Sequence, residues 1–123
     1  MFIKQDWFMR QIEVLAAAIA QLIFGRGEVL HEIREEGRNT SGALLEREPM
    51  ALLKRGRLCE GEDALFRTLD LSDREDLLFA TEFYREANRL SDEELAAQDF
   101  TREELWDGLR EVVSLYGVEI PGF

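Results

Sequence analysis

The sequence has one cysteine, one histidine and two prolines among 123 residues, and these shortages exclude several classes of protein. Cys59 has no second cysteine to pair with, which excludes a disulfide-stapled miniprotein and makes a reducing cytoplasm the expected compartment. Cys59 and His31 together offer two ligands, whereas a structural zinc site needs four. We therefore expect no metal site of this kind and no cofactor.

Long hydrophobic runs and basic charge are also scarce. The longest uninterrupted apolar run, Val14 to Ala20, has seven residues, and a helix needs about 20 to cross a bilayer. No membrane span is therefore expected. The 15 Lys and Arg residues face 26 Asp and Glu residues, a formal net charge of −11. Such a chain is repelled by phosphate backbones, so nucleic acid is not an expected partner.

The net negative charge arises entirely from the second half of the chain. Residues 1–60 hold 9 basic and 9 acidic residues, whereas residues 61–123 hold 6 and 17. The acidic half also has apolar residues at helical spacing, so its carboxylates are expected mainly on the solvated faces of helices. If this half binds a protein, we expect a basic segment attracted in a salt-dependent way. Arg supplies 13 of the basic residues, a skew that suggests a GC-rich bacterial genome.

The pattern of apolar residues predicts an all-α fold. No segment shows the period-two alternation of a half-buried strand, and 46% of the residues are apolar, enough for one core at this length. We expect a single domain over residues 1–123, a compact bundle of about seven helices. The expected helices cover residues 6–24, 27–36, 43–53 with a start or kink at Pro49, 59–70, 73–89, 92–98 and 102–116. Residues 118–123 are expected to form a surface tail, with Ile120 or Phe123 as anchors, because Pro121 cannot continue a helix.

Three capping boxes mark the starts of the last three helices. In such a box a hydroxyl and a carboxylate three residues later each bond a free backbone N–H of the first helical turn. The predicted pairs are Ser72 with Glu75, Ser91 with Glu94, and Thr101 with Glu104. The helix over 73–89 has the widest apolar face and is predicted to lie at the centre of the core.

The N-terminal segment, residues 1–24, is predicted to contain a long amphipathic helix over residues 6–24, with Asp6 as its N-cap. Its apolar load is large for a terminal helix, which favours a role in oligomerisation. The candidate interaction residues are Trp7, Phe8, Ile12, Leu15, Ile19, Leu22 and Ile23. Docking of the same face onto the chain's own core is the equal alternative.

The residue types used in catalysis have ordinary structural explanations here. Glu28 and His31 have the E-x-x-H spacing of di-metal helices, but no second such pair exists and surface ion pairing explains them. Cys59 lacks a neighbouring base and is expected to be a small buried residue. The paired carboxylates lie in first helical turns, where they complement the helix dipole. An enzyme is therefore the less favoured interpretation.

Two stretches carry a resemblance to a known family. The opening follows the pattern M-F-x-x-Q-D-x-x-M-R-x-I, and the chain from Gly56 through Phe83 and Tyr84 to the motif LSDEELAAQDFTREELWDGL continues it. In these features the chain resembles a family of small uncharacterised bacterial proteins, classed as a domain of unknown function. The resemblance implies no substrate or catalytic residue.

Part of the second stretch is similar to one helix pair of a tetratricopeptide repeat. The matching positions are Gly56, Leu58, Gly61, Leu65 and Leu69. Gly61 replaces the usual Ala and Pro49 stands where a small residue belongs, so one degenerate repeat is present at most. Three repeats are needed for a solenoid, and the resemblance therefore implies helix-hairpin packing and not peptide binding.

The sequence favours a non-enzymatic protein–protein interaction or scaffold module that self-associates through its N-terminal helix. The alternative is an enzyme or small-ligand binder whose site uses scattered Arg, Glu, Asp and Tyr residues. A pocket lined by Arg67, Arg85 and Tyr84 would favour that alternative, and a solid core would count against it.

Overall fold

The computed structural model describes residues 2–24 and 47–120. Its helices are α1 (Phe2–Phe24), α3 (Glu48–Lys54), α4 (Leu58–Thr68), α5 (Arg74–Asn88), α6 (Asp92–Ala97) and α7 (Arg102–Leu115). Within those ranges the regular structure is entirely helical, which confirms the predicted all-α class. The described residues form six helices, whereas about seven were predicted for the whole chain. The predicted helix over 27–36, which contains His31, lies outside the described residues.

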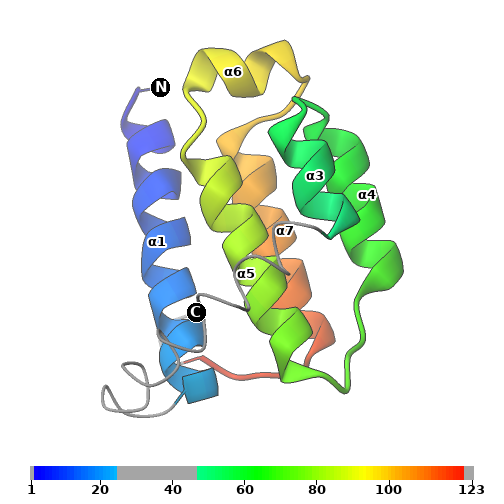
Figure 1. Cartoon of the computed structure of the whole chain (residues 1–123). Coiled ribbons are helices and arrows are strands. Elements are labelled where there is room, and N and C mark those ends of the chain that lie inside the picture. The colour runs from blue at the N-terminus through cyan, green and yellow to red at the C-terminus, as the bar shows by residue number, and fades with distance from the viewer. Residues whose placement is uncertain (1, 25–46, 121–123) are drawn as a thin grey trace.

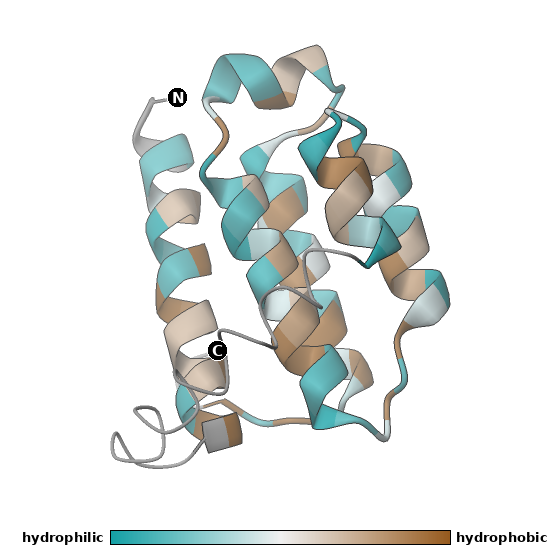
Figure 2. Ribbon diagram, in the orientation of Figure 1, coloured by the Kyte–Doolittle hydropathy of each residue, from teal (hydrophilic) through white to brown (hydrophobic). Residues whose placement is uncertain are grey.

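Helix α5 lies at the centre of the bundle (Figure 1). Helix α1 packs along one side of α5, α3 and α4 lie on the other side, and α6 crosses the top. Helices α1 and α7 run in one direction and α5 runs in the opposite one, with α7 behind α5 in this view (Figure 1). In α1 the hydrophilic residues lie mainly toward the N-terminal end and the hydrophobic ones toward the C-terminal end (Figure 2).

The core forms around α5, as predicted for the segment with the widest apolar face. Its buried apolar residues are Leu77, Phe79, Ala80, Phe83, Tyr84 and Ala87. They join a cluster that includes Ile12 of α1, Leu65 of α4 and Leu109 of α7. The Phe83 and Tyr84 rings meet edge to face with their centroids 5.3 Å apart. Burial of this apolar surface is the main favourable term in folding.

The N-terminus of α6 confirms the predicted capping box. The backbone N–H of Glu94 donates to Ser91 Oγ at 3.1 Å, and that of Ser91 donates to Glu94 Oε1 at 3.0 Å. At α7 only half of the box forms. The Glu104 N–H donates to Thr101 Oγ1 at 3.1 Å, but the Glu104 carboxylate accepts from the Thr101 hydroxyl instead of the backbone.

The prediction of a capping box between Ser72 and Glu75 is wrong. Asp73 is the N-cap of α5, and its Oδ1 accepts from the Glu75 backbone N–H at 2.9 Å. The Ser72 N–H and hydroxyl both donate to Asp70 Oδ1, at 2.9 and 2.6 Å. Asp70 thus holds Ser72 in an Asx turn, so the hydroxyl is not available as a cap.

Three helices end in a left-handed residue. At Gly56 (φ 77°) and Gly117 (φ 66°), and also at Asp99 (φ 55°), the residue that follows bonds back to a carbonyl five positions earlier. This is the Schellman motif, which satisfies the free carbonyls of a last helical turn. The motif at Gly117 confirms the predicted end of α7. Beyond it, Val118 and Ile120 pack against the core, as expected of an anchored tail.

Helix α1 starts earlier than predicted. It begins at Phe2, and Asp6 lies exposed inside the helix and is not its N-cap. No Gly or Pro occurs between Phe2 and Asp6, so nothing in the sequence stops the helix from extending upstream. The described α1 is therefore 23 residues long.

Helices α3 and α4 form a hairpin joined by the turn at Gly56. Pro49 lies in the first turn of α3, where its missing N–H costs no helical hydrogen bond. A Cβ at position 61 would lie 2.9 Å from the Pro49 carbonyl oxygen and 3.3 Å from the Phe83 ring. Gly61 therefore permits the close approach of α4 to both α3 and α5.

Candidate protein-interaction surface

The predicted interaction residues of α1 divide into two groups. Ile12, Leu15 and Ile19 are buried in the chain's own core, and Phe8 and Ile23 are partly buried against it. Trp7 and Leu22 remain exposed, by 44% and 48%. The apolar face of α1 is thus wider than its contact with α5 and α7 requires.

The neighbours of α1 show which side of the helix is covered. Toward α5, Asn88 Nδ2 donates to the Met9 carbonyl at 3.1 Å and Arg85 pairs with Glu13 at 3.4 Å. Toward α7, the Trp7 and Trp106 rings meet edge to face with their centroids 6.0 Å apart. The side of α1 that bears Trp7 therefore borders α7 and is open beyond it.

Three large apolar residues form a line along this open side. Trp7, Val14 and Leu22 are 44%, 53% and 48% exposed and are seven and eight residues apart, about two helical turns each. We call them the α1 stripe. Gln11 and Ala18 lie between them and are half-buried.

Val14 is a surface residue that was not among the predicted interaction residues. The predicted residues have the spacing of the core face, whereas Val14 lies one position before Leu15, on a different side of the helix. The available signal was its distance of seven residues from Trp7, which places the two on the same side.

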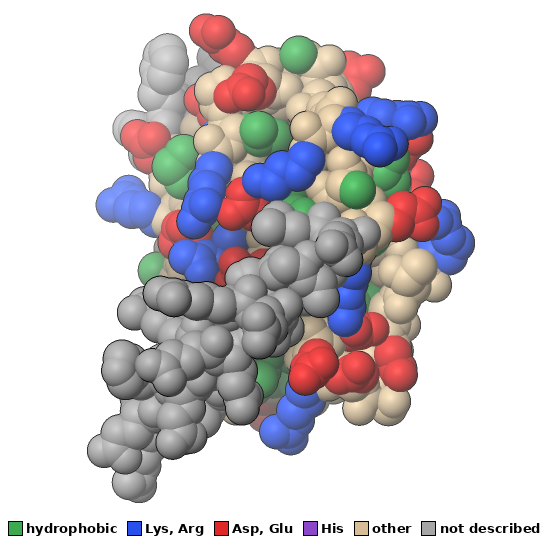
Figure 3. Space-filling model, viewed as in Figure 1, with side chains coloured by type: hydrophobic (Ala, Val, Ile, Leu, Met, Phe, Trp, Pro, Cys, Tyr) green, Lys and Arg blue, Asp and Glu red, His purple; other side chains and the backbone are tan. Residues whose placement is uncertain are grey.

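The charge on α1 differs from that of the acidic half. Its ionisable residues are Lys4, Asp6, Arg10 and Glu13, so the helix is formally neutral. On the face seen in Figure 1, acidic side chains gather over α6 at the top (Figure 3), where Asp92, Glu93 and Glu94 occupy the first turn. An approaching second copy of this chain meets less repulsion at α1 than at the acidic helices.

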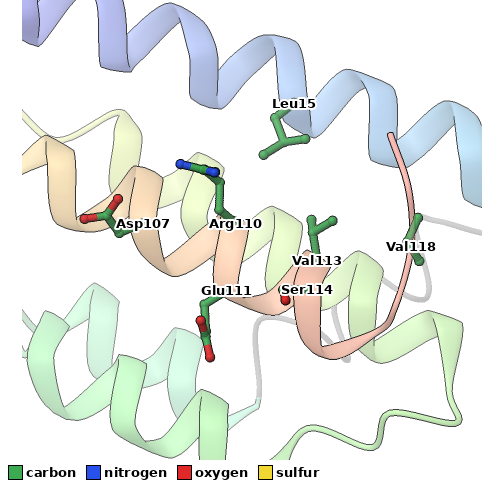
Figure 4. A pocket seen from close by; sticks show the side chains of 7 residues that line it. All are labelled: Leu15, Asp107, Arg110, Glu111, Val113, Ser114 and Val118. Atoms are coloured by element: carbon green, nitrogen blue, oxygen red, sulfur yellow. The ribbon is translucent and has the colours of Figure 1, made fainter. Parts of the chain in front are cut away.

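A depression of about 520 Å³ lies on the outer face of α7, beside α1. Its lining residues are Leu15, Asp107, Arg110, Glu111, Val113, Ser114 and Val118. The Arg110 side chain points toward α1 and the Glu111 side chain points away from it (Figure 4). The Arg110 guanidinium lies 5.7 Å from the centroid of the Trp106 ring, in the range of a cation–π contact.

Three exposed carboxylates follow one another along the outer face of α7. Glu103, Asp107 and Glu111 are four residues apart, so they stack in a row, which we call the acidic strip. None of the three forms an ion pair with another described residue. Like charges at this spacing destabilise a helix slightly, so the strip is a cost to the isolated fold.

The residues proposed for a small-ligand site do not meet. Arg67 pairs with Glu48 of α3 at 3.3 Å, and Arg85 pairs with Glu13 of α1. Tyr84 is buried and donates to Glu62 Oε2 at 2.6 Å. The three side chains thus have separate partners, and none of them lines the depression on α7.

Cys59 is exposed, so the expectation that it is buried is wrong. It lies in the first turn of α4, where its thiol donates to the Gln98 carbonyl at 3.5 Å. Partial desolvation, followed by the nearby carboxylates of Glu104 and Glu62, raises the pKa of the thiol. A raised pKa keeps the sulfur protonated and lowers its reactivity as a nucleophile.

The described residues contain neither a metal-binding group nor a membrane-spanning helix. Among residues 2–24 and 47–120, no group of three or more His, Cys, Asp or Glu side chains is placed to hold a metal ion. None of the helices in these ranges combines the length and the apolar character that crossing a membrane requires.

Comparison with known proteins gives a family and no activity. Neither the curated proteins nor the solved structures include a match to this chain. One family model matches residues 2–117, nearly the whole chain, in agreement with the resemblance seen in the sequence. The chain belongs to this family, which is described as a family of unknown function (DUF6483).

Proposed function

We propose that the protein is a protein–protein interaction module that self-associates through α1. The α1 stripe carries this proposal, because three large apolar side chains lie exposed in one line on a formally neutral helix. Exposed apolar lines of this kind are typical of helix–helix interfaces. Trp7 adds a residue type that often dominates binding energy.

The distribution of charge supports the choice of α1 over the other helices. Two copies that each carry a net charge of −11 repel one another in solution. All of that excess lies in residues 61–123, so α4 to α7 are poor surfaces for contact between identical chains. A contact through α1 buries apolar surface on a helix that carries no formal net charge.

Sedimentation velocity of the full chain tests this proposal with two matched variants. Leu22 and Leu71 are 48% and 49% exposed, and only Leu22 belongs to the α1 stripe. We expect a concentration-dependent dimer for the unchanged chain, a monomer for Leu22→Glu, and a dimer for Leu71→Glu. A monomeric unchanged chain, or equal effects of the two variants, would contradict self-association through α1.

A second candidate function is the binding of a basic protein segment, and the acidic strip favours it. Glu103, Asp107 and Glu111 repel one another along α7. A cationic partner would relieve that repulsion, and the neighbouring depression offers room for its side chains. Attraction between exposed charges weakens as salt screens them.

Fluorescence anisotropy with a labelled oligo-arginine peptide tests this second function. We expect the double variant Asp107→Asn, Glu111→Gln to bind at least several-fold more weakly than the unchanged chain at low salt. The matched control, Glu75→Gln with Glu93→Gln, removes the same charge from exposed positions on other helices. Equal affinity of the two double variants would refute a specific role for the acidic strip.

We also place the protein in a bacterial cytoplasm and consider the α3–α4 hairpin tetratricopeptide-like. The single free cysteine, Cys59, supports a reducing compartment, because the sequence has no second cysteine with which it could form a disulfide. The predominance of Arg among the basic residues supports a bacterial source. The close contact of Gly61 with Pro49 supports the hairpin comparison. Thiol labelling of protein taken directly from intact cells tests the compartment, since an oxidised Cys59 would contradict it.

A further inference from the structure

We infer that two copies of α1 pair in antiparallel orientation, with the two-fold axis level with the peptide between Val14 and Leu15. This inference rests on the proposed self-association through α1 and specifies its geometry. An axis at this level brings Trp7 beside the partner's Leu22 at both ends of the contact. The two Val14 side chains then lie next to each other at the middle.

The residues between the stripe positions fit the same register. The antiparallel axis places Gln11 beside the partner's Ala18, so a long side chain meets a small one on each side of the centre. Both positions are half-buried and line the open side of α1 with the stripe. Closely packed helices need such pairing of large with small side chains.

A parallel pairing fits this surface less well. It would set Trp7 against Trp7 and Ala18 against Ala18, which crowds one end of the contact and leaves a gap further along. It would also bring equal ends of the two helix dipoles together. The antiparallel arrangement avoids both costs.

Among the described residues, the side of α1 that this register uses remains exposed at Trp7, Val14 and Leu22. Glu13 and the Met9 carbonyl are bonded to α5, so that side of α1 is occupied. The stripe begins at Trp7, whose ring touches Trp106 of α7, and continues past the depression toward Leu22. A partner helix can therefore lie along α1 without displacing α5.

Disulfide trapping in the full chain tests the register. In a Cys59→Ser background, which keeps a side chain able to donate to Gln98, two variants each add one cysteine: Gln11→Cys and Ala18→Cys. Facing Cα atoms of paired helices lie within the span of about 4.4–6.8 Å that a disulfide bridges. In the antiparallel register the two Gln11 positions are offset by about 10 Å along the helix axis, given a rise of about 1.5 Å per residue.

We expect a mixture of the Gln11→Cys and Ala18→Cys chains to give a disulfide-linked dimer on mild oxidation. Each variant alone should give at least several-fold less of it. Self-linkage of each variant alone, with a dimer still seen by sedimentation and lost in Leu22→Glu, would overturn the antiparallel register and leave self-association standing. A monomer by sedimentation with no disulfide-linked dimer in any sample would overturn both.

Discussion

Arg102 is fully buried and donates from Nη1 to both oxygens of Asn88, 2.7 Å to the backbone carbonyl and 2.9 Å to Oδ1. Its Nη2 donates to the Leu90 carbonyl at 2.9 Å and to Asp92 Oδ1 at 2.8 Å. One guanidinium thus joins the start of α7 to the end of α5 and the turn before α6. The planar arrangement of its donors suits this set of acceptors, which a single ammonium could not reach.

We expect Arg102→Ala to lower the free energy of unfolding by about 3–5 kcal/mol, because it leaves buried carbonyls without a partner. Arg102→Lys should cause an intermediate loss of stability, since lysine keeps the positive charge but lacks the planar set of guanidinium donors. Urea unfolding followed by circular dichroism measures both. The control Arg110→Ala removes an exposed guanidinium that lies over Trp106 and should cost about 0.5–1 kcal/mol. Equal losses at the two positions would contradict this role of Arg102.

Glu62 and Glu94 should respond to pH in opposite directions. Desolvation raises the pKa of Glu62 above its ordinary value of 4.5, against the lowering effect of its hydrogen bond from Tyr84. Its protonated form is therefore favoured in the folded state. The stability that Glu62 contributes is fully present below pH 4.5 and is lost as the pH rises through the raised pKa of Glu62. For Glu94, the hydrogen bond from the Ser91 N–H lowers the pKa, so its contribution is present above 4.5 and is lost as the pH falls.

Urea unfolding of Glu62→Gln and Glu94→Gln across the acidic and neutral range measures this difference. Relative to the unchanged chain, Glu62→Gln should gain stability as the pH rises above 4.5, while Glu94→Gln should lose stability as the pH rises toward 4.5 from below. Parallel pH profiles of the two variants would be inconsistent with the opposite pKa shifts.

The helices were predictable where their signals are local. Capping residues and left-handed stops lie within a few residues of the helix ends that they define, so α6 and α7 were predicted to within one residue at each end. At the start of α5 two neighbouring residues could each serve as the N-cap, and the N-cap is Asp73 instead of the predicted Ser72. The start of α1 differs from the prediction because Asp6, a residue type common at N-caps, lies inside an uninterrupted helix.

The candidate surface was less predictable because burial depends on distant neighbours. Leu15 and Leu22 satisfy the same helical pattern, yet the core covers Leu15 and leaves Leu22 exposed. Arg102, directly after the cap of α7, has the local context of a surface residue, and it is buried by contacts 10 to 14 positions away. Cys59 shows the reverse, since a residue type usually found inside lies at an exposed helix start.

Asp99 and Gly117 make a paired test of the left-handed helix ends. A side chain in this conformation costs about 1–2 kcal/mol, which Asp tolerates better than most residues. We expect Asp99→Gly to be neutral or to stabilise by up to about 1 kcal/mol, and Gly117→Ala to destabilise by about 1 kcal/mol. Apart from its two chain neighbours, no described residue has an atom within 4 Å of a Cβ at Gly117, so backbone strain alone would account for the loss. Thermal unfolding measures both, and a stabilising Gly117→Ala would contradict the argument.

Gly108 permits a close approach of the Tyr84 and Glu62 side chains to α7. A Cβ at this position would overlap the Tyr84 hydroxyl and would lie 2.6 Å from Glu62 Oε2. Gly108→Ala should therefore disrupt the Tyr84–Glu62 hydrogen bond and destabilise the fold by about 1–3 kcal/mol, although Ala alone favours a helix by about 1 kcal/mol. Removing the hydroxyl should relieve the overlap, so the loss caused by Gly108→Ala should be smaller in a Tyr84→Phe background. A double-mutant cycle from urea unfolding measures this coupling, and additive losses would show that the Tyr84 hydroxyl is not what excludes a side chain from position 108.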